Sequence, residues 1–148
     1  MRLILFFLST LSIVALSCKN GAQEPVEKTI KPADLPADFQ AFYQRFHADS
    51  AYQMSHIEWP LKGERPNPSE NGGSKKMLTA WEPEDWSLFS APDLADVGLK
   101  RTIETMGDAL IIERLEYPMV NYGLERQFFK DDNQEWHLIY YAEMQELR

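Results

Sequence analysis

His47 and Asp49 are the best pair in this sequence for acid–base chemistry. A histidine and a carboxylate close together can serve as base and acid when both reach the same substrate atom. The two residues lie two positions apart in a segment with helical periodicity, where side chains at i and i+2 point about 200° apart. They would therefore not share a face. We expect His47 to be a partly exposed histidine, and the sequence identifies no catalytic residue.

The sequence gives little support for a metal site and lacks the common catalytic motifs. A metal site needs about three or four converging ligands, whereas the chain has only the histidines His47, His56 and His137 and no HExxH or CxxC spacing. His56 and His137 fall on predicted strands and could meet, although His137 is also explained as a surface position in a hairpin. The GxSxG elbow of serine hydrolases and the lysine spacing of a phosphate-binding loop are absent. We predict neither a metal nor a cofactor.

Aromatic side chains are the remaining candidates for a binding site. The chain has four tryptophans and six tyrosines, which combine large apolar faces with polar tips and line many ligand pockets. Such residues also fill ordinary cores. From their positions we select as candidate pocket-lining residues Tyr43, His47, Trp81, Trp86 and Tyr140.

The N-terminal segment MRLILFFLSTLSIVALSCKN predicts export. Arg2 is followed by an uncharged run from Leu3 to Leu16, and a small residue precedes Cys18, which is the layout of a secretory signal peptide. The run is shorter than the about 20 apolar residues that a membrane-spanning helix needs. We therefore predict a signal peptide over residues 1–17.

Cys18 is the only cysteine, so an intramolecular disulfide is not possible. Its place after Ser17 resembles the lipobox of bacterial lipoproteins, in which the cysteine becomes the N-terminus and carries acyl chains. The resemblance implies that a lipid on Cys18 attaches the protein to a membrane, and Lys19 favours the outer membrane. The alternative is an ordinary signal-peptidase site with Ala15 and Ser17, which would leave a free N-terminal thiol. Residues 18–36 are then the lipidated cysteine and a flexible tether.

The charge of the chain argues against a nucleic-acid partner. Its net charge is −8, and no basic stripe interrupts the acidic composition. Phosphate backbones attract basic surfaces, so an acidic protein repels them.

The periodicity of the remaining chain predicts one helix followed mainly by strands. Residues 37–48 place Phe39, Phe42, Tyr43 and Phe46 at the spacing of an amphipathic helix. Alternation and turn residues then predict a strand at 55–62, an exposed loop at 63–75, a strand at 77–81, a helix start at 83–89 and another helical turn at 92–97.

The last third of the chain is predicted to form antiparallel sheet. Its strands are expected at 101–106, 109–116, 122–130 and 135–144. The polar turn 131–134 predicts a hairpin between the last two strands. Strict alternation along the final strand would place Tyr140 on one face with Trp136 and Leu138, and Tyr141 on the other.

This order of elements predicts the α+β class and a single domain over residues 37–148. We expect a curved antiparallel sheet wrapped around the N-terminal helix, which gives a cone-like shape.

Three stretches together resemble a known family. They are DFQAFYQRFHADSAYQMSHIEWPLKG, the Trp-rich middle of the chain and the closing FFKDDNQEWHLIYY hairpin. They resemble a family of bacterial lipoproteins, family 4348 of the domains of unknown function, which is placed in the nuclear transport factor 2-like superfamily. The resemblance covers about residues 37–146. It implies a cone that members use as an enzyme pocket, a ligand-binding cavity or a dimer surface, so the fold does not select a function.

We therefore expect a non-catalytic module that binds a small apolar or glycan-like ligand, or another envelope protein. Two alternatives stay open: a small isomerase or hydratase that uses the cone pocket, and an assembly partner of an envelope complex that works as a homodimer. A buried carboxylate or histidine with a perturbed pKa in a closed pocket would favour the enzyme. A pocket lined by aromatic rings would favour binding, and a flat exposed apolar sheet face would favour assembly.

Overall fold

The computed structural model of this protein describes residues 28–29, 34–67, 76–89 and 99–145. The predicted signal peptide, Cys18 and most of the predicted tether lie outside these residues, as does the predicted helical turn at 92–97. Most of the predicted loop at 63–75 also lies outside them.

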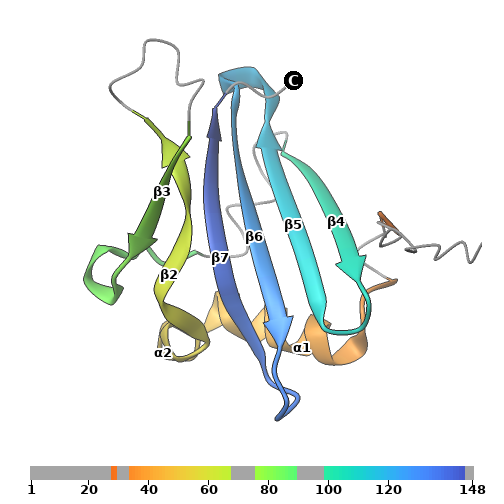
Figure 1. Ribbon diagram of the computed structural model, residues 1–148. Coiled ribbons are helices and arrows are strands. Elements are labelled where there is room, and N and C mark those ends of the chain that lie inside the picture. Colours follow the sequence, from red (N-terminus) through yellow and green to blue (C-terminus); the bar gives the residue numbers. More distant parts are fainter. Residues whose placement is uncertain (1–27, 30–33, 68–75, 90–98, 146–148) are drawn as a thin grey trace, which may run out of the picture.

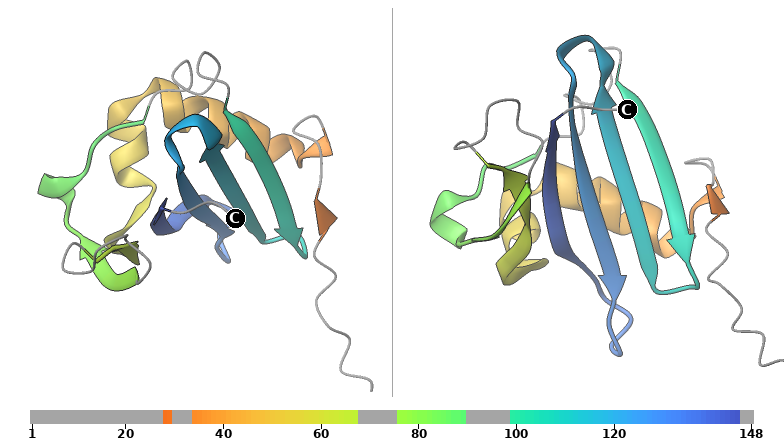
Figure 2. Two further views of the ribbon diagram at one scale, coloured as in Figure 1. Left: turned by 90° about the horizontal axis from the view of Figure 1, so that it is seen from above. Right: turned by 45° about the horizontal axis from the view of Figure 1, so that its top comes forward.

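The described strands form one seven-stranded sheet in the order β1-β4-β5-β6-β7-β2-β3. The strands are β1 Lys28–Thr29, β2 Ile57–Pro66, β3 Lys76–Trp81, β4 Lys100–Met106, β5 Leu110–Tyr117, β6 Tyr122–Lys130 and β7 Trp136–Gln145, and short 3-10 turns are η2 Pro83–Asp85 and η4 Pro118–Val120. The helices α1 (Ala37–Ala48) and α2 (Ser50–Ser55) lie against one face of the curved sheet (Figure 1, Figure 2). Among the described residues, none of the helices has the length and apolarity needed to cross a membrane.

The α+β class and most of the predicted elements are confirmed. Helix α1 and strand β6 have the predicted bounds, and the last four strands pair antiparallel as predicted. The prediction of a fully antiparallel sheet is wrong, because β2 and β7 pair in the parallel sense. The direction of a strand depends on its partner in space, which the periodicity within one segment does not specify.

The segment between α1 and β2 differs from the strand predicted at 55–62. The Asp49 carboxylate accepts a hydrogen bond from the backbone N–H of Tyr52 at 3.0 Å, so it caps the start of α2. The residues from Tyr52 to Ser55 are therefore helical, and β2 begins only at Ile57.

Strand β2 also continues beyond its predicted end. It runs to Pro66, into the segment predicted as an exposed loop at 63–75, because β3 pairs with it on one side and β7 on the other. Pairing on both sides satisfies its backbone groups without a run of apolar side chains. The helix expected to start at 83–89 is limited to the 3-10 turn η2.

Part of the predicted tether contacts the fold. Lys28 and Thr29 pair with Thr105 and Glu104 of β4, and the Leu35 side chain is buried in the core. The packed structure thus begins before residue 37.

Phenylalanines of α1 form the centre of the core. Phe39, Phe42 and Phe46 are at most 5% exposed and meet Phe128 of β6 edge-on, with ring centroids 5.4, 5.8 and 5.8 Å apart. Each buried ring contributes roughly 1.5–3 kcal/mol, and edge-to-face contact adds to that. These contacts confirm the predicted apolar stripe and seat α1 across β6.

An extra residue in β7 changes which of its side chains face this core. Phe128 and Gln127 are neighbours in β6, but their partners in β7, Leu138 and Tyr140, are not. The residue left between them is a β-bulge, which shifts the alternation of the strand by one position. Beyond the bulge, Tyr141 is buried in the interior. The predicted grouping of Tyr140 with Leu138 on one face is therefore wrong.

A row of paired residues crosses the sheet just after the bulge: Ile103, Glu113, Arg126, Tyr141, Gly63 and Thr79. Gly63 is the tightest point of this row. A Cβ atom at this position would lie 1.6 Å from the carbonyl oxygen of Tyr141 and 2.6 Å from Cζ3 of Trp81. The missing side chain is what allows β2 to pair with β7 while the Trp81 ring lies beside the junction.

We expect Gly63→Ala to lower the free energy of unfolding by roughly 1–3 kcal/mol or more, because the added methyl group meets backbone atoms that cannot move aside. Urea unfolding measures this change. Lys62→Ala changes the exposed neighbour and should stay within about 0.5 kcal/mol. An unchanged urea midpoint for Gly63→Ala would contradict the parallel pairing of β2 with β7.

Candidate functional site

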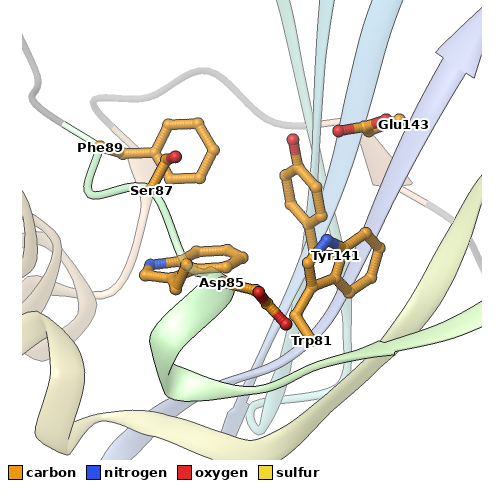
Figure 3. A pocket seen from close by; sticks show the side chains of 7 residues that line it. Trp81, Asp85, Ser87, Phe89, Tyr141 and Glu143 are labelled. Atoms are coloured by element: carbon orange, nitrogen blue, oxygen red, sulfur yellow. The ribbon is translucent and has the colours of Figure 1, made fainter.

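A small pocket lies between β3, the segment that follows η2, and β7 (Figure 3). Its lining residues are Trp81, Asp85, Trp86, Ser87, Phe89, Tyr141 and Glu143. The cavity volume is about 100 Å³, well below the about 300–1,000 Å³ of pockets for drug-sized ligands. The pocket therefore has room for a compact chemical group.

Four aromatic rings form the walls of this pocket. Tyr141 lies edge-on to Trp81 and to Trp86, with ring centroids 5.0 and 5.3 Å apart and interplanar angles of 80° and 83°. Phe89 is the fourth ring, and its centroid lies 5.5 Å from that of Trp86 and 5.7 Å from that of Tyr141. Edge-to-face contacts of this kind hold the rings in fixed orientations around the pocket.

Two carboxylates belong to the same pocket. Asp85 comes from η2 and Glu143 from β7. In Figure 3 the Asp85 carboxylate lies between the side of the pocket formed by Phe89 and the side formed by Trp81, and Glu143 lies near the hydroxyl end of Tyr141. Among the described residues, the lining includes no lysine or arginine. The pocket thus combines apolar walls with negative charge.

Hydrogen bonds of Gln53 in α2 connect the pocket wall formed by Trp86 and Phe89 to the helices. It is 1% exposed, and its amide nitrogen donates hydrogen bonds to the carbonyls of Phe46 and Phe89 at 2.7 and 2.9 Å. Its amide oxygen accepts from the backbone N–H of Phe89 at 3.0 Å and from the indole N–H of Trp86 at 3.3 Å. The donors and acceptors of this buried amide are thereby used.

A network of charged and polar side chains adjoins the pocket in the interior. Glu113 is 1% exposed and Arg126 is fully buried. One Glu113 oxygen accepts from Nε and Nη2 of Arg126 at 2.8 and 2.5 Å. The other accepts from Nε of Arg101 at 2.6 Å and from the Tyr43 hydroxyl at 2.8 Å. The Arg126 guanidinium also lies 5.2 Å from the ring centroid of Phe89, which connects the network to the pocket wall.

These contacts set the charge of the network. Burial alone would raise the pKa of Glu113, but Arg126, Arg101 and the Tyr43 hydroxyl outweigh burial and hold the pKa of this carboxyl below its usual range. Burial raises the pKa of the Tyr43 hydroxyl, which therefore stays neutral. The interior thus contains an ionised carboxylate that is already surrounded by donors.

His47 is buried, which corrects the prediction of a partly exposed histidine. Its Nδ1 lies 2.8 Å from the backbone oxygen of Tyr43, and its Nε2 lies 3.0 Å from Nη1 of Arg126. A carbonyl only accepts and a guanidinium only donates, so the ring is neutral with its proton on Nδ1. Burial, together with the Arg126 charge, lowers the pKa of His47 to about 4. Sequence spacing could not reveal this, because the partner Arg126 is far away along the chain.

This arrangement limits the acid–base chemistry of the interior. A general base needs a free lone pair within reach of the substrate. Glu113 accepts four hydrogen bonds, and both ring nitrogens of His47 are used. Neither residue lines either of the two pockets that the structure describes. The network is therefore suited to holding the fold rather than to proton transfer.

The structure brings two of the predicted lining residues, Trp81 and Trp86, into the pocket. Tyr43 and His47 belong to the adjoining network instead. Tyr140 belongs neither to the pocket nor to the adjoining network, because the bulge brings the next residue of β7, Tyr141, to the interior. Burial and two neighbouring glutamates raise the pKa of Tyr140 to about 12.

The sequence analysis did not identify several residues of the site. They are Gln53, Asp85, Phe89, Tyr141 and Glu143. The run WEPEDWSLF at 81–89 contained a signal, since it places aromatic rings and acids close together without the spacing of a regular helix. Gln53 gave no signal, because a glutamine in a helix is usually exposed.

A second pocket of about 380 Å³ lies beside α1 and the turn between β6 and β7. Its lining residues are Asp38, Ala41, Phe42, Arg45, Tyr52, His56, Gln134, Glu135 and Trp136. The Arg45 guanidinium lies 4.0 Å from the centroid of the Tyr52 ring, and the His56 ring stacks on Tyr52 at 3.7 Å. These stacked groups use the ring faces that a ligand would otherwise contact.

The same turn contains the one group of potential metal ligands found among the described residues. Ligand atoms of Asp131, Glu135 and His137 lie within 4.8 Å of one another, and the ring of His56 lies 5.5 Å from that of His137. However, the Asp131 carboxylate already accepts from the backbone N–H groups of Asn133 and Glu135 at 2.9 and 2.8 Å. These hydrogen bonds form the turn, so the grouping is explained without a metal ion.

Comparison with known proteins identifies relatives of this fold. A protein-family model matches residues 37–115, more than half of the chain. The chain is similar to a nuclear transport factor 2-like protein from Bacteroides fragilis, with 16% identity, a TM-score of 0.57, and coverage of 78% of this chain and 50% of that one. It is also similar to a cystatin-like protein from Bacteroides caccae, with 14% identity, a TM-score of 0.51, and coverage of 70% and 74%. The chain thus spans half the length of the first protein, and no curated protein sequence matches it.

We expect His47 to make the stability of the protein depend on pH. Its pKa is 6.5 without the fold and about 4 within it, so between these values the unfolded chain binds a proton that the folded chain does not. The stability contribution is complete above about pH 6.5 and is lost as the pH falls towards about 4. The loss should be a few kcal/mol, because one pKa unit corresponds to about 1.4 kcal/mol.

Urea midpoints measured from about pH 7 down to about pH 4.5 check this expectation. His47→Gln keeps an acceptor for Arg126 and should remove most of the slope. His56→Gln changes a histidine outside the network and should leave the slope in place. If the parent protein and His47→Gln show equal slopes, His47 is not a buried neutral histidine.

Proposed function

We propose that this chain, which belongs to the nuclear transport factor 2-like superfamily, is a non-catalytic binding module of the bacterial cell envelope. The observation that carries the proposal is the pocket walled by Trp81, Trp86, Phe89 and Tyr141. Aromatic rings that pack against one another form a pocket that exists without a ligand, and such preformed pockets are typical of binding sites. The narrower assignment to family 4348 stays a prediction.

The enzyme alternative finds less support in the same interior. Glu113 and His47 are the buried bases of the network that adjoins the pocket, and both are engaged with Arg126 and its neighbours. The carboxylates of Asp85 and Glu143 remain, but Asp85 is exposed and Glu143 is only half-buried. Catalytic carboxyl groups usually depend on a dry surrounding to tune their pKa values.

The size of the pocket favours a compact group as its occupant. A cavity of about 100 Å³ fits the end of a small molecule or one side chain of an envelope protein. A glycan-like ligand is less suited, because a chain of sugar rings needs a longer stacking platform than this enclosure offers. Homodimerisation and an assembly role stay predictions.

We further propose that a lipid on Cys18 holds the module at the outer membrane. The support is the sequence alone: the lipobox-like position of Cys18, the uncharged run before it and Lys19 after it. Acyl chains contribute about 0.8 kcal/mol per buried methylene, so several chains on one cysteine would anchor the protein firmly. The polar residues that follow would let the domain reach away from the membrane surface.

A thermal-shift screen of purified protein against small apolar molecules, sugars, steroids and amine solutes tests the binding function. A ligand at about 100 times its Kd adds about 2.7 kcal/mol of stability, which is visible as a raised melting temperature. We expect Trp86→Leu to abolish the shift produced by any hit, because it removes one wall. Tyr140→Leu alters an aromatic residue outside the pocket and should leave the shift intact.

A folded protein that responds to no compound would contradict the binding function. A hit whose shift survives Trp86→Leu would contradict the assignment of the site to this pocket, because the ligand would then bind elsewhere in the molecule.

Lipidation can be tested separately in a bacterial host. We expect the parent protein to partition into the detergent phase and to carry labelled palmitate, whereas Cys18→Ser should do neither. Mass spectrometry of the mature N-terminus distinguishes the alternative. A free N-terminal thiol on a water-soluble protein would show that ordinary signal peptidase cuts before Cys18.

A further inference from the structure

The charge of the pocket indicates a narrower ligand class than its shape does. Aromatic rings form its walls, Asp85 and Glu143 add two carboxylates, and the described lining includes no lysine or arginine. We propose that the pocket binds an alkylated ammonium group such as trimethylammonium. This inference rests on the proposed function as a binding module and names its ligand class.

The first argument comes from the ring faces. A cation within about 6 Å of a ring centroid is attracted by the negative face of the ring, and tryptophan is the strongest partner. The centroid of Tyr141 lies 5.0 Å from that of Trp81 and 5.3 Å from that of Trp86. These rings pack directly against one another and line the same pocket, so a group in the pocket can contact more than one of them. Phe89 supplies a further ring on the remaining side.

The second argument concerns the kind of cation. A primary ammonium has three N–H donors and a guanidinium has five, and each buried donor needs an acceptor. Ring faces provide few acceptors, and Asp85 and Glu143 come from different elements. An alkylated ammonium carries the same charge on an apolar surface, so it packs against the rings and needs only charge compensation. The compact volume of about 100 Å³ suits such a group.

The surrounding charges are compatible with a bound cation. The chain has a net charge of −8, which raises the local concentration of cations. Arg126 approaches the wall at Phe89, with 5.2 Å between its guanidinium and the ring centroid. Its charge is partly compensated by Glu113, whose oxygen lies 2.5 Å from Nη2 and which also pairs with Arg101. Asp85 and Glu143 are the charged side chains that line the pocket itself, and both are negative.

Choline and its uncharged carbon isostere, 3,3-dimethylbutan-1-ol, test this proposal by calorimetric titration. The two molecules have almost the same shape, so a difference in affinity reports the charge. We expect choline to bind at least about tenfold more tightly, and its affinity to fall with added salt. Asp85→Asn and Glu143→Gln should each weaken choline about threefold without changing the affinity for the isostere. Asp108→Asn removes one charge from the exposed turn between β4 and β5 and should change neither.

The outcomes separate this proposal from the function on which it rests. Equal affinity for choline and the isostere would overturn the cation inference and leave the binding module standing. If neither choline nor the isostere binds, but another compound of the screen binds through Trp86, the cation inference is also overturned and the binding module stands. No binding of any compound would remove both.

A second comparison identifies the source of the ammonium group. Protein that begins at residue 19, and therefore lacks both the lipid and the apolar run of residues 3–16, is mixed with vesicles of phosphatidylcholine or of phosphatidylglycerol and sedimented. Binding to phosphatidylcholine alone, competed by soluble choline, indicates a lipid headgroup. Binding of soluble choline without sedimentation indicates a free solute.

Discussion

The buried pair of Arg126 and Glu113 is the interaction on which the packing of the interior depends. Each charge taken out of water costs several kcal/mol, and only close and complete hydrogen bonding compensates for that cost. Tyr43 and His47 from α1 and Arg101 from β4 supply the remaining partners of the pair. Any other seating of α1 would remove the hydrogen bonds that Tyr43 and His47 make to these buried charges. The network therefore fixes the helix more narrowly than the phenylalanine contacts, which other apolar arrangements could replace.

The same network supports the pocket from behind. Tyr141 is the strand neighbour of Arg126 across β6 and β7, and Phe89 lies over the guanidinium. Gln53 joins the other end of the wall segment to α2 through Trp86 and Phe89. The walls thus come from elements far apart in the chain, and those formed by Trp86 and Phe89 are held by the buried amide of Gln53. Walls that are fixed before binding lower the entropy cost of capturing a ligand.

Local patterns were sufficient to predict α1, the hairpin of β6 and β7, and most of the other strands, because those elements follow from side-chain spacing within one segment. The errors arose where distant residues decide. His47 looked exposed because its partner Arg126 belongs to another element, and Gln53 looked ordinary because Phe89 is not near it in sequence. The direction of β2 depends on β7 in the same way. Tyr140 was misplaced by a single residue of β7 that periodicity cannot detect.

The bulge in β7 allows one strand to contribute side chains both to the helix core and to the pocket. Before it, Trp136 and Leu138 face the helix core, and after it Tyr141 and Glu143 face the pocket. Because the two halves have opposite phase, the residues that face the interior have even numbers before the bulge and odd numbers after it. In evolutionary terms, one codon in this strand determines which residues of its two halves face the interior together. A lineage that lost this codon would change the phase of one half of the strand against the other, so Tyr141 and Glu143 could not face the pocket while Trp136 and Leu138 face the helix core.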